Sequence, residues 1–210
     1  MDTAEQQRAG TIPQPFVVAP PAGDPLVLGL GSFVAGATVV GFDLTGVFAG
    51  APVYLAVTLG SSALGLLIAT LWAARLGQSF VAAVTGLFSS FWFSLAIILF
   101  GLFNGWFGDT TALGFDPVRA FYWSWAIVIF LLTIASLRLP IMFVLLIGLV
   151  DLTLILLGVA YAGDEPTTGL IKLAGWVLWG SGVVGALLFV GAGSVSLGGK
   201  GMSPGPPVVK

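Results

Sequence analysis

Long apolar segments, separated by short polar or Gly/Pro-rich stretches, account for most of the chain between Leu26 and Val195. A helix needs about 20 mostly apolar residues to cross a bilayer, and six segments come close to that length. They are Leu26–Phe42, Pro52–Ala74, Phe80–Phe103, Val118–Leu137, Pro140–Tyr161 and Leu170–Ser194. The pattern predicts an all-α integral membrane protein, with six transmembrane helices within residues 25–195.

Residues at the segment ends indicate where individual helices begin. Asp24 followed by Pro25 suits a helix start, because an aspartate caps the first amide groups and proline has no N–H to leave unpaired. Ser79 is predicted as the N-cap of the third helix, and Pro140 as the start of the fifth. The first helix is the shortest, and its apolar pattern allows it to run past Asp43.

The two ends of the chain differ from the segments between them. Residues 1–24 are polar and Pro-rich, and residues 196–210 are rich in Gly and Pro. Segments of this kind bury too little apolar surface to order themselves. We therefore expect residues 1–24 to be a disordered cytoplasmic tail and residues 196–210 to be a flexible cytoplasmic tail.

The composition fits a lipid environment and excludes several kinds of chemistry. Of the 210 residues, 58% are hydrophobic and 8% are charged, whereas a soluble domain has about 25% charged residues. The absence of His and Cys excludes disulfides, thiolate catalysis and Cys/His metal sites. No paired carboxylates share one segment at helical spacing, and no basic patch suits nucleic acid. We therefore expect neither an enzyme nor a cofactor or metal site.

The distribution of basic residues predicts the orientation in the membrane. Both tails and the even-numbered connections hold five of them, Arg8, Arg75, Arg138, Lys200 and Lys210. The odd-numbered side holds only Arg119 and Lys172, beside several acidic residues. Because positive residues concentrate on the cytoplasmic side, we expect both termini in the cytoplasm, with the protein in the plasma membrane.

One carboxylate, Asp151, lies inside the fifth apolar segment. An ionisable group at bilayer depth costs about 2.5–3.5 kcal/mol on insertion scales, so such residues usually face protein or a water-filled path. The functional interpretation of Asp151 is a pore-side proton acceptor that relays a proton or donates a hydrogen bond to a carboxylate. The structural interpretation is an aspartate bonded to a Ser or Thr on a neighbouring helix or subunit.

Three motifs stand in order along the chain. They are Asp24-Pro25-Leu26-Val27-Leu28-Gly29-Leu30-Gly31-Ser32-Phe33; Gly77-Gln78-Ser79-Phe80 followed by Leu87-Phe88-Ser89-Ser90-Phe91-Trp92; and Ala174-Gly175-Trp176. They resemble the signatures of the acetate uptake transporter family, the succinate–acetate permeases. Those signatures are Asn-Pro-x-Pro-Leu-Gly-Leu-x-Gly-Phe, Gly-Asn-Thr-Phe followed by Ser-Tyr-Gly-x-Phe-Trp, and Ala-Gly-Trp. The resemblance covers residues 26–190.

This resemblance implies a hexamer in which each subunit has its own pore for small monocarboxylates or succinate. The family's apolar constriction of Phe, Tyr and Leu falls on Phe33, Phe88 and a position at or next to Val150. The constriction would therefore lie within about a turn of Asp151, where the family has an uncharged residue. Five further residues are assigned to the pore or to helix packing, namely Gly29, Ser32, Ser89, Ser90 and Trp176.

The sequence departs from the family pattern at several of these positions. Asp24 replaces the leading Asn, Val27 replaces the second Pro, and Phe88 lacks the hydroxyl of the family's Tyr. We interpret the chain as a channel or proton-coupled permease for small carboxylates such as acetate or succinate, assembled as a homo-oligomer. The alternative interpretation is a membrane subunit that transports nothing and scaffolds a larger complex.

Overall fold

The computed structural model describes residues 23–48, 52–109 and 114–209. Six α-helices follow one another along the chain: α1 (Pro25–Thr45), α2 (Pro52–Arg75), α3 (Ser79–Phe103), α4 (Asp116–Ala135), α5 (Ile141–Ala160) and α6 (Thr168–Ser196). All six contain a window long and apolar enough to cross a membrane. The predicted class and the number of spans are therefore confirmed.

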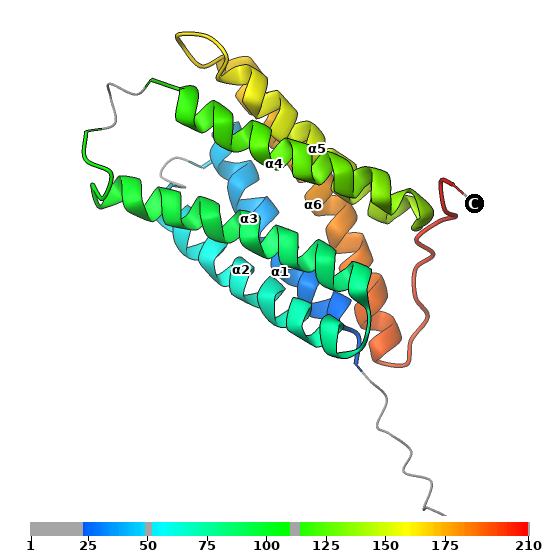
Figure 1. Ribbon diagram of the computed structural model, residues 1–210. Helices are drawn as coiled ribbons and strands as arrows, with labels where there is room; N and C mark the ends of the chain where they lie inside the picture. The colour runs from blue at the N-terminus through cyan, green and yellow to red at the C-terminus, as the bar shows by residue number, and fades with distance from the viewer. Residues whose placement is uncertain (1–22, 49–51, 110–113, 210) are drawn as a thin grey trace, which may run out of the picture.

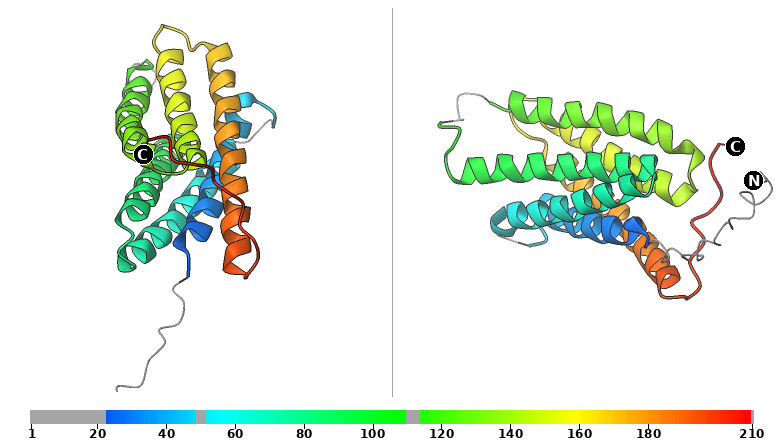
Figure 2. Two further views of the ribbon diagram at one scale, coloured as in Figure 1. Left: turned by 90° about the vertical axis from the view of Figure 1, so that its right-hand side faces the viewer. Right: turned by 60° about the horizontal axis from the view of Figure 1, so that its bottom comes forward.

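The helices form an up-and-down bundle in which each packs beside the next in sequence, except that α3 and α4 approach each other less closely (Figures 1 and 2). The last helix, α6, returns to pack against α1. Aromatic rings join α3 to α4, since Phe91 lies 5.3 Å from Trp125 and 6.0 Å from Phe121 between ring centroids. The six helices therefore surround a common core. The bundle has a near end, where α1, α3 and α5 begin, and a far end, where they finish.

Local chemistry explains where α1 begins and ends. The Asp24 side chain accepts a hydrogen bond of 2.9 Å from the Leu26 amide, which confirms the predicted cap. The helix runs past Asp43 to Thr45, and Gly46 ends it in the left-handed conformation at φ 71°. A non-glycine residue is strained in that conformation, so Gly46 suits the end of the helix.

The predicted cap of α3 is wrong. Gln78 occupies the N-cap position and makes no side-chain capping bond, while Ser79 is the first helical residue. At this position the Ser79 hydroxyl is one residue too late to cap the helix. Other predicted ends agree with the structure to within about three residues, the usual uncertainty for helix termini.

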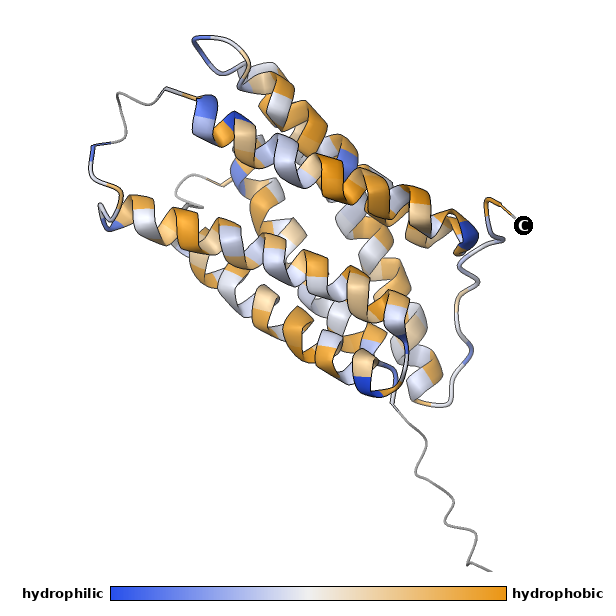
Figure 3. Ribbon diagram, viewed as in Figure 1, coloured by the Kyte–Doolittle hydropathy of each residue, from blue (hydrophilic) through white to orange (hydrophobic). Residues whose placement is uncertain are grey.

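The outer surface of the bundle is apolar along the helices (Figure 3). Large hydrophobic side chains such as Leu64, Ile127 and Val190 are 58–64% exposed. Soluble monomers rarely expose large contiguous apolar patches. Apart from the buried Asp151, the described charged residues lie near the helix ends and in the connections, so lipid is the solvent for the exposed faces between.

Small residues let α1 and α6 approach closely. A Cβ added at Gly185 would lie 3.1 Å from Val34 and 3.2 Å from the Phe33 ring, and one at Gly175 would lie 2.8 Å from Thr45. Membrane helices associate without a hydrophobic drive between them, so close packing and interhelical hydrogen bonds hold them together. One such bond, of 2.9 Å, runs from Ser181 on α6 to the Leu146 carbonyl on α5.

The C-terminal segment, expected to be flexible, is instead attached to the near end of the bundle. It runs from α6 to the start of α5 (Figure 2), where the amides of Ile141 and Met142 donate to the carbonyls of Pro206 and Pro204 at 3.0 and 3.2 Å. The first amides of a helix have no partner within the helix, and Pro140 at the N-cap has no side chain to cap them. The segment supplies these missing acceptors.

We predict that Gly205→Ala detaches this segment. Gly205 has φ 83°, and an added Cβ would lie 2.5 Å from Ile141, so the alanine adds a clash to a backbone strain of roughly 1–3 kcal/mol. Trypsin should then cleave after Lys200 about tenfold faster, as followed by the loss of residues 201–210 in the mass of the intact protein.

The matched control is Gly193→Ala, because an added Cβ there meets no atom within 4 Å. Cleavage after Lys200 at the same rate in both variants would show that the segment is not held at Gly205.

Candidate functional site

The three residues predicted to form a constriction all lie in the core of the bundle. Phe33 on α1, Phe88 on α3 and Val150 on α5 are at most 3% exposed. The rings of Phe33 and Phe88 meet edge to face at 5.1 Å, and Phe33 lies 6.4 Å from Trp92. Close approach of α6 at Gly185 places its backbone against Phe33. The two phenylalanines therefore close the core where α1, α3 and α6 meet.

A small cavity lies beside this aromatic cluster, on its far-end side. It has a volume of about 20 Å³ and is lined by residues that include Val40, Trp92, Tyr122, Val150 and Leu157. A cavity of about 10–15 Å³ can hold one water molecule, so this one has room for little more. Acetate does not fit in the cavity in this structure, and passage through the core requires side chains to move.

A larger groove of about 650 Å³ lies over α1 between α2 and α6, toward the near end. Its lining includes Asp24, Ser32, Ser62, Trp72 and Phe189. It is more open than the cavity, and the two spaces share no lining residue.

Asp151 is buried but lies on a different side of α5 from Val150. A Cβ added at Gly148 or Gly158, which share the face of Asp151, would lie 3.7 Å from Thr133 or 2.9 Å from Trp123 of α4. Val150 lines the small cavity and Asp151 does not, because consecutive helical residues point in directions about 100° apart. Asp151 therefore faces α4 and not the aromatic cluster, although it lies at the same depth.

The carboxylate of Asp151 has no Ser or Thr partner within the described chain. It is 5% exposed, and its Oδ1 atom has no hydrogen-bond partner. The nearby Thr153 and Ser181 hydroxyls donate instead to carbonyls of Leu149 and Leu146. Under the structural interpretation, a partner for the Asp151 carboxylate must therefore come from a neighbouring subunit.

The five residues assigned to the pore or to packing have separate locations. Gly29 is buried, and a Cβ added to it would lie 3.0 Å from Thr85. The Ser89 hydroxyl donates a hydrogen bond of 2.8 Å to the Ala63 carbonyl of α2. Ser32 lines the groove. Ser90 is exposed and bonds within α3, and Trp176 is 57% exposed. Ser90 and Trp176 therefore lie on the outer surface of the bundle.

Sequence reasoning did not identify a polar cluster at the far end. The rings of Tyr122 on α4 and Tyr161 after α5 stack at 5.8 Å, and Asp43 near the end of α1 is close to both. Burial raises the pKa of the Tyr161 phenol, and the negative charge of Asp43 raises it further. Asp43, Tyr122 and Tyr161 lie in different segments and share no local motif, so no pattern in the sequence pointed to this cluster.

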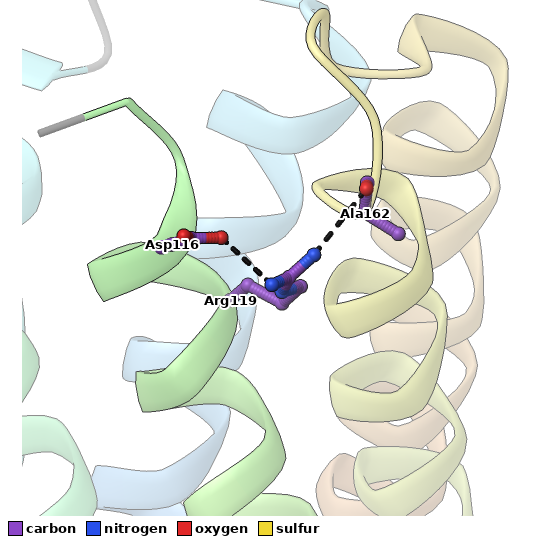
Figure 4. A network of polar contacts seen from close by, with 3 residues as sticks. All are labelled: Asp116, Arg119 and Ala162. Carbon is purple, nitrogen blue, oxygen red and sulfur yellow. Dashed lines mark hydrogen bonds and ion pairs between the residues drawn. The ribbon is translucent and has the colours of Figure 1, made fainter.

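The described basic residues stay away from the core. Each lies in a connection or within two turns of a helix end. At the far end, Arg119 pairs with Asp116 at 2.7 Å and donates at 3.3 Å to the Ala162 carbonyl, which joins α4 to the loop after α5 (Figure 4). No cation of the described chain is therefore available to bind an anion tightly within the core.

The arrangement suits passage of a small solute more than chemical conversion. Within the described residues, no group of three or more Asp or Glu side chains could hold a metal. The core offers aromatic rings, small residues and a few hydroxyls. Such a lining selects by size and by a small number of hydrogen bonds.

Comparison with known proteins identifies the family to which the chain belongs. Residues 11–193 match the model of the GPR1/FUN34/yaaH family, which covers most of the chain and all six helices. No curated protein matches the chain.

We predict that Asp43→Asn lowers the pKa of Tyr161 part of the way toward its ordinary value of 10.0, because it removes the negative charge but not the burial. The measurement is the absorbance of tyrosinate during an alkaline titration, with Tyr54→Phe and Tyr122→Phe in the background so that only Tyr161 titrates.

Asp24→Asn at the near end is the control, because asparagine also caps helices well and the change removes a charge elsewhere. A Tyr161 pKa that is the same with aspartate or asparagine at position 43 would contradict the proximity of these groups.

Proposed function

Because the chain belongs to the GPR1/FUN34/yaaH family, which is the acetate transporter family, we propose that it carries small carboxylates, acetate first among them, across the plasma membrane. The chain is a multi-pass membrane protein with six spanning helices. The path runs through the core of each subunit, past Phe33, Phe88 and Val150.

The observation that carries this proposal is the closure of the core by apolar side chains alone. Phe33 and Phe88 meet edge to face, and the space beside them is only about 20 Å³. Rotation of one ring opens this contact, so the pair acts as a gate that admits small solutes.

The absence of cations from the described core favours rapid passage over tight capture. A lysine or arginine in a low-dielectric interior would hold a carboxylate strongly. Hydrogen-bond donors without charge hold it weakly, so the solute leaves as readily as it enters. This behaviour suits uptake of a metabolite that is present at high concentration.

We also propose that both termini are cytoplasmic, as the distribution of basic residues favours, and that the protein is a homo-hexamer, as its resemblance to the succinate–acetate permeases implies. The near end then faces the cytoplasm, together with Arg75, Arg138 and Lys200. Native mass of the purified protein tests the hexamer. A scaffold protein of the same fold would show no flux of any small acid in liposomes.

Flux into liposomes tests the function. We expect the wild-type protein to take up labelled acetate above the rate of protein-free liposomes. Phe33→Ala should widen the path, because it removes one ring of the gate, and should raise uptake of a bulkier acid such as benzoate relative to acetate by about tenfold.

Phe130→Ala is the matched control, since Phe130 is a phenylalanine on α4 that is 52% exposed. The same ratio of benzoate to acetate uptake in Phe33→Ala and in the wild type would contradict a gate at Phe33. No acetate flux in the wild type would contradict transport itself.

Proton coupling is tested at Asp151, the one acidic residue at the middle of a described span. We expect Asp151→Asn to abolish acetate accumulation driven by an imposed pH gradient and to leave downhill flux near the wild-type rate, because asparagine carries no exchangeable acidic proton. Uptake is measured over a range of pH, with protein-free liposomes to correct for diffusion of acetic acid through lipid.

Asp116→Asn, at an exposed helix start, is the control for loss of a carboxylate. Accumulation that persists in Asp151→Asn at every pH would show that Asp151 relays no proton.

A further inference from the structure

The open groove over α1 is not part of the proposed transport path. Its floor is α1, its walls are residues of α2 and α6, and its volume is about 650 Å³. The floor runs from Asp24, which caps α1, to Ala35, which lies at the middle of that helix. The groove therefore belongs to the near half of the bundle and ends about half-way across it.

The length of the groove matches one leaflet of a bilayer. Ala35 follows Asp24 by 11 residues, which is a rise of about 16 Å at roughly 1.5 Å per helical residue. Half of the hydrocarbon core of a bilayer is about 15 Å thick. A helix of a second subunit would span the whole core, so a groove limited to one half suits the acyl chain of a lipid better.

The lining of the groove suits a hydrocarbon chain. Val27 and Leu28 lie on its floor, and Phe189 is on the α6 wall. A Cβ added at Gly31 would lie 3.2 Å from the Phe189 ring, so this part of the floor is bare backbone beside an aromatic ring. The Ser61 hydroxyl in the α2 wall donates to the Thr58 carbonyl at 2.9 Å, and it therefore needs no partner from the groove.

Each wall of the groove carries a basic residue at the near end, which we call its mouth. Trp72 lines the α2 wall, and Arg75 follows it by one turn as the last residue of α2. Ser196 lines the α6 wall, and Lys200 follows it closely. The Ser194 hydroxyl donates to the Lys200 carbonyl at 2.9 Å, which holds the backbone of Lys200 beside the end of α6. Both basic residues are exposed.

The charge at the mouth is positive and available. Neither Arg75 nor Lys200 forms an ion pair within the described chain. Asp24 is the acidic residue of the mouth, and its carboxylate already accepts the Leu26 amide at 2.9 Å. Two cations therefore outweigh one anion there. A phosphate group complements this excess, whereas the near end of a second subunit would carry the same excess and be repelled.

We propose that the groove binds one anionic phospholipid of the near leaflet. The phosphate lies between Arg75 and Lys200, and an acyl chain lies over the floor from Val27 to Ala35. With both termini in the cytoplasm, this leaflet is the cytoplasmic one, to which anionic lipids give a negative surface potential. The lipid fills the space that α1 leaves between α2 and α6, and its binding does not depend on what the protein transports.

The headgroup is tested by native mass spectrometry of the full chain, freed of lipid in detergent and titrated with phosphatidylglycerol. A basic residue close to an anionic lipid contributes roughly fivefold in affinity. Arg75→Gln and Lys200→Gln should therefore each raise the Kd of phosphatidylglycerol about fivefold. The wild type should bind phosphatidylglycerol more tightly than phosphatidylcholine, and the double variant should lose this preference.

Two variants control for the loss of a positive charge elsewhere. Arg138→Gln removes an exposed cation that is also at the near end but does not flank the groove, and Lys172→Gln removes one at the far end. Both should keep the wild-type Kd. Equal losses in Arg75→Gln and Arg138→Gln, or equal affinity of the wild type for the two lipids, would overturn the proposal, because neither result needs a site.

The acyl chain is tested by filling the floor of the groove. Ala35 is exposed there, and Ala35→Phe places a ring in the space of the chain. Ala83→Phe is the matched control, since Ala83 is an exposed alanine of α3 that does not line the groove. A phosphatidylglycerol with a diazirine near the end of its acyl chain should crosslink to residues 27–35 in the wild type and in Ala83→Phe, and should lose these crosslinks in Ala35→Phe. Crosslinks that persist in Ala35→Phe would overturn the proposal.

The chain has no cysteine, so Ala35→Cys introduces a single thiol that identifies the occupant of the groove. A photoreactive group attached to this thiol in liposomes of phosphatidylglycerol should yield a lipid adduct of one subunit. A crosslink to a second subunit as the main product would overturn the proposal, because another copy would then fill the groove. Thermal unfolding shows that each variant is folded, and acetate flux enters none of these measurements, so a failure of the proposed transport function would leave their outcome unchanged.

Discussion

Lipid offers no hydrogen-bond partner, and the rest of this structure depends on that constraint. Each polar group in a span must find its partner inside the protein. Most hydroxyls do so by bonding to a carbonyl of their own helix, as Thr153 does, or of a neighbouring helix, as Ser89 and Ser181 do. The C-terminal segment meets the same requirement at the start of α5. There, the carbonyls of Pro204 and Pro206 accept hydrogen bonds from amides that have no partner within the helix.

Against this background, the buried groups that lack a partner become informative. The Trp92 indole Nε1 and the Ser62 hydroxyl are buried without a partner in the described chain, and the Trp92 ring and Ser62 Cβ pack against Gly36 of α1. Each unpaired group at this depth destabilises the protein by about 1–3 kcal/mol.

The proposed gate and the far-end cluster have different physical roles. Phe33 and Phe88 meet edge to face in the core, and in the proposed function this contact admits solutes by size. At the far end, Asp43, Tyr122 and Tyr161 form a polar cluster that marks where the core meets the aqueous side.

The sequence by itself determined the class of protein, the six spans and the cap at Asp24, because apolar run length and local capping chemistry act within one helix. Tertiary structure alone decided which side of α5 carries Asp151, since a difference of one residue turns a side chain by about 100°. It also decided that the C-terminal segment is held, because the amides it satisfies lie some 60 residues away along the chain. The meeting of Gly36, Ser62 and Trp92 has the same origin: each residue is ordinary within its own helix, and only the packing of three helices brings them to one point.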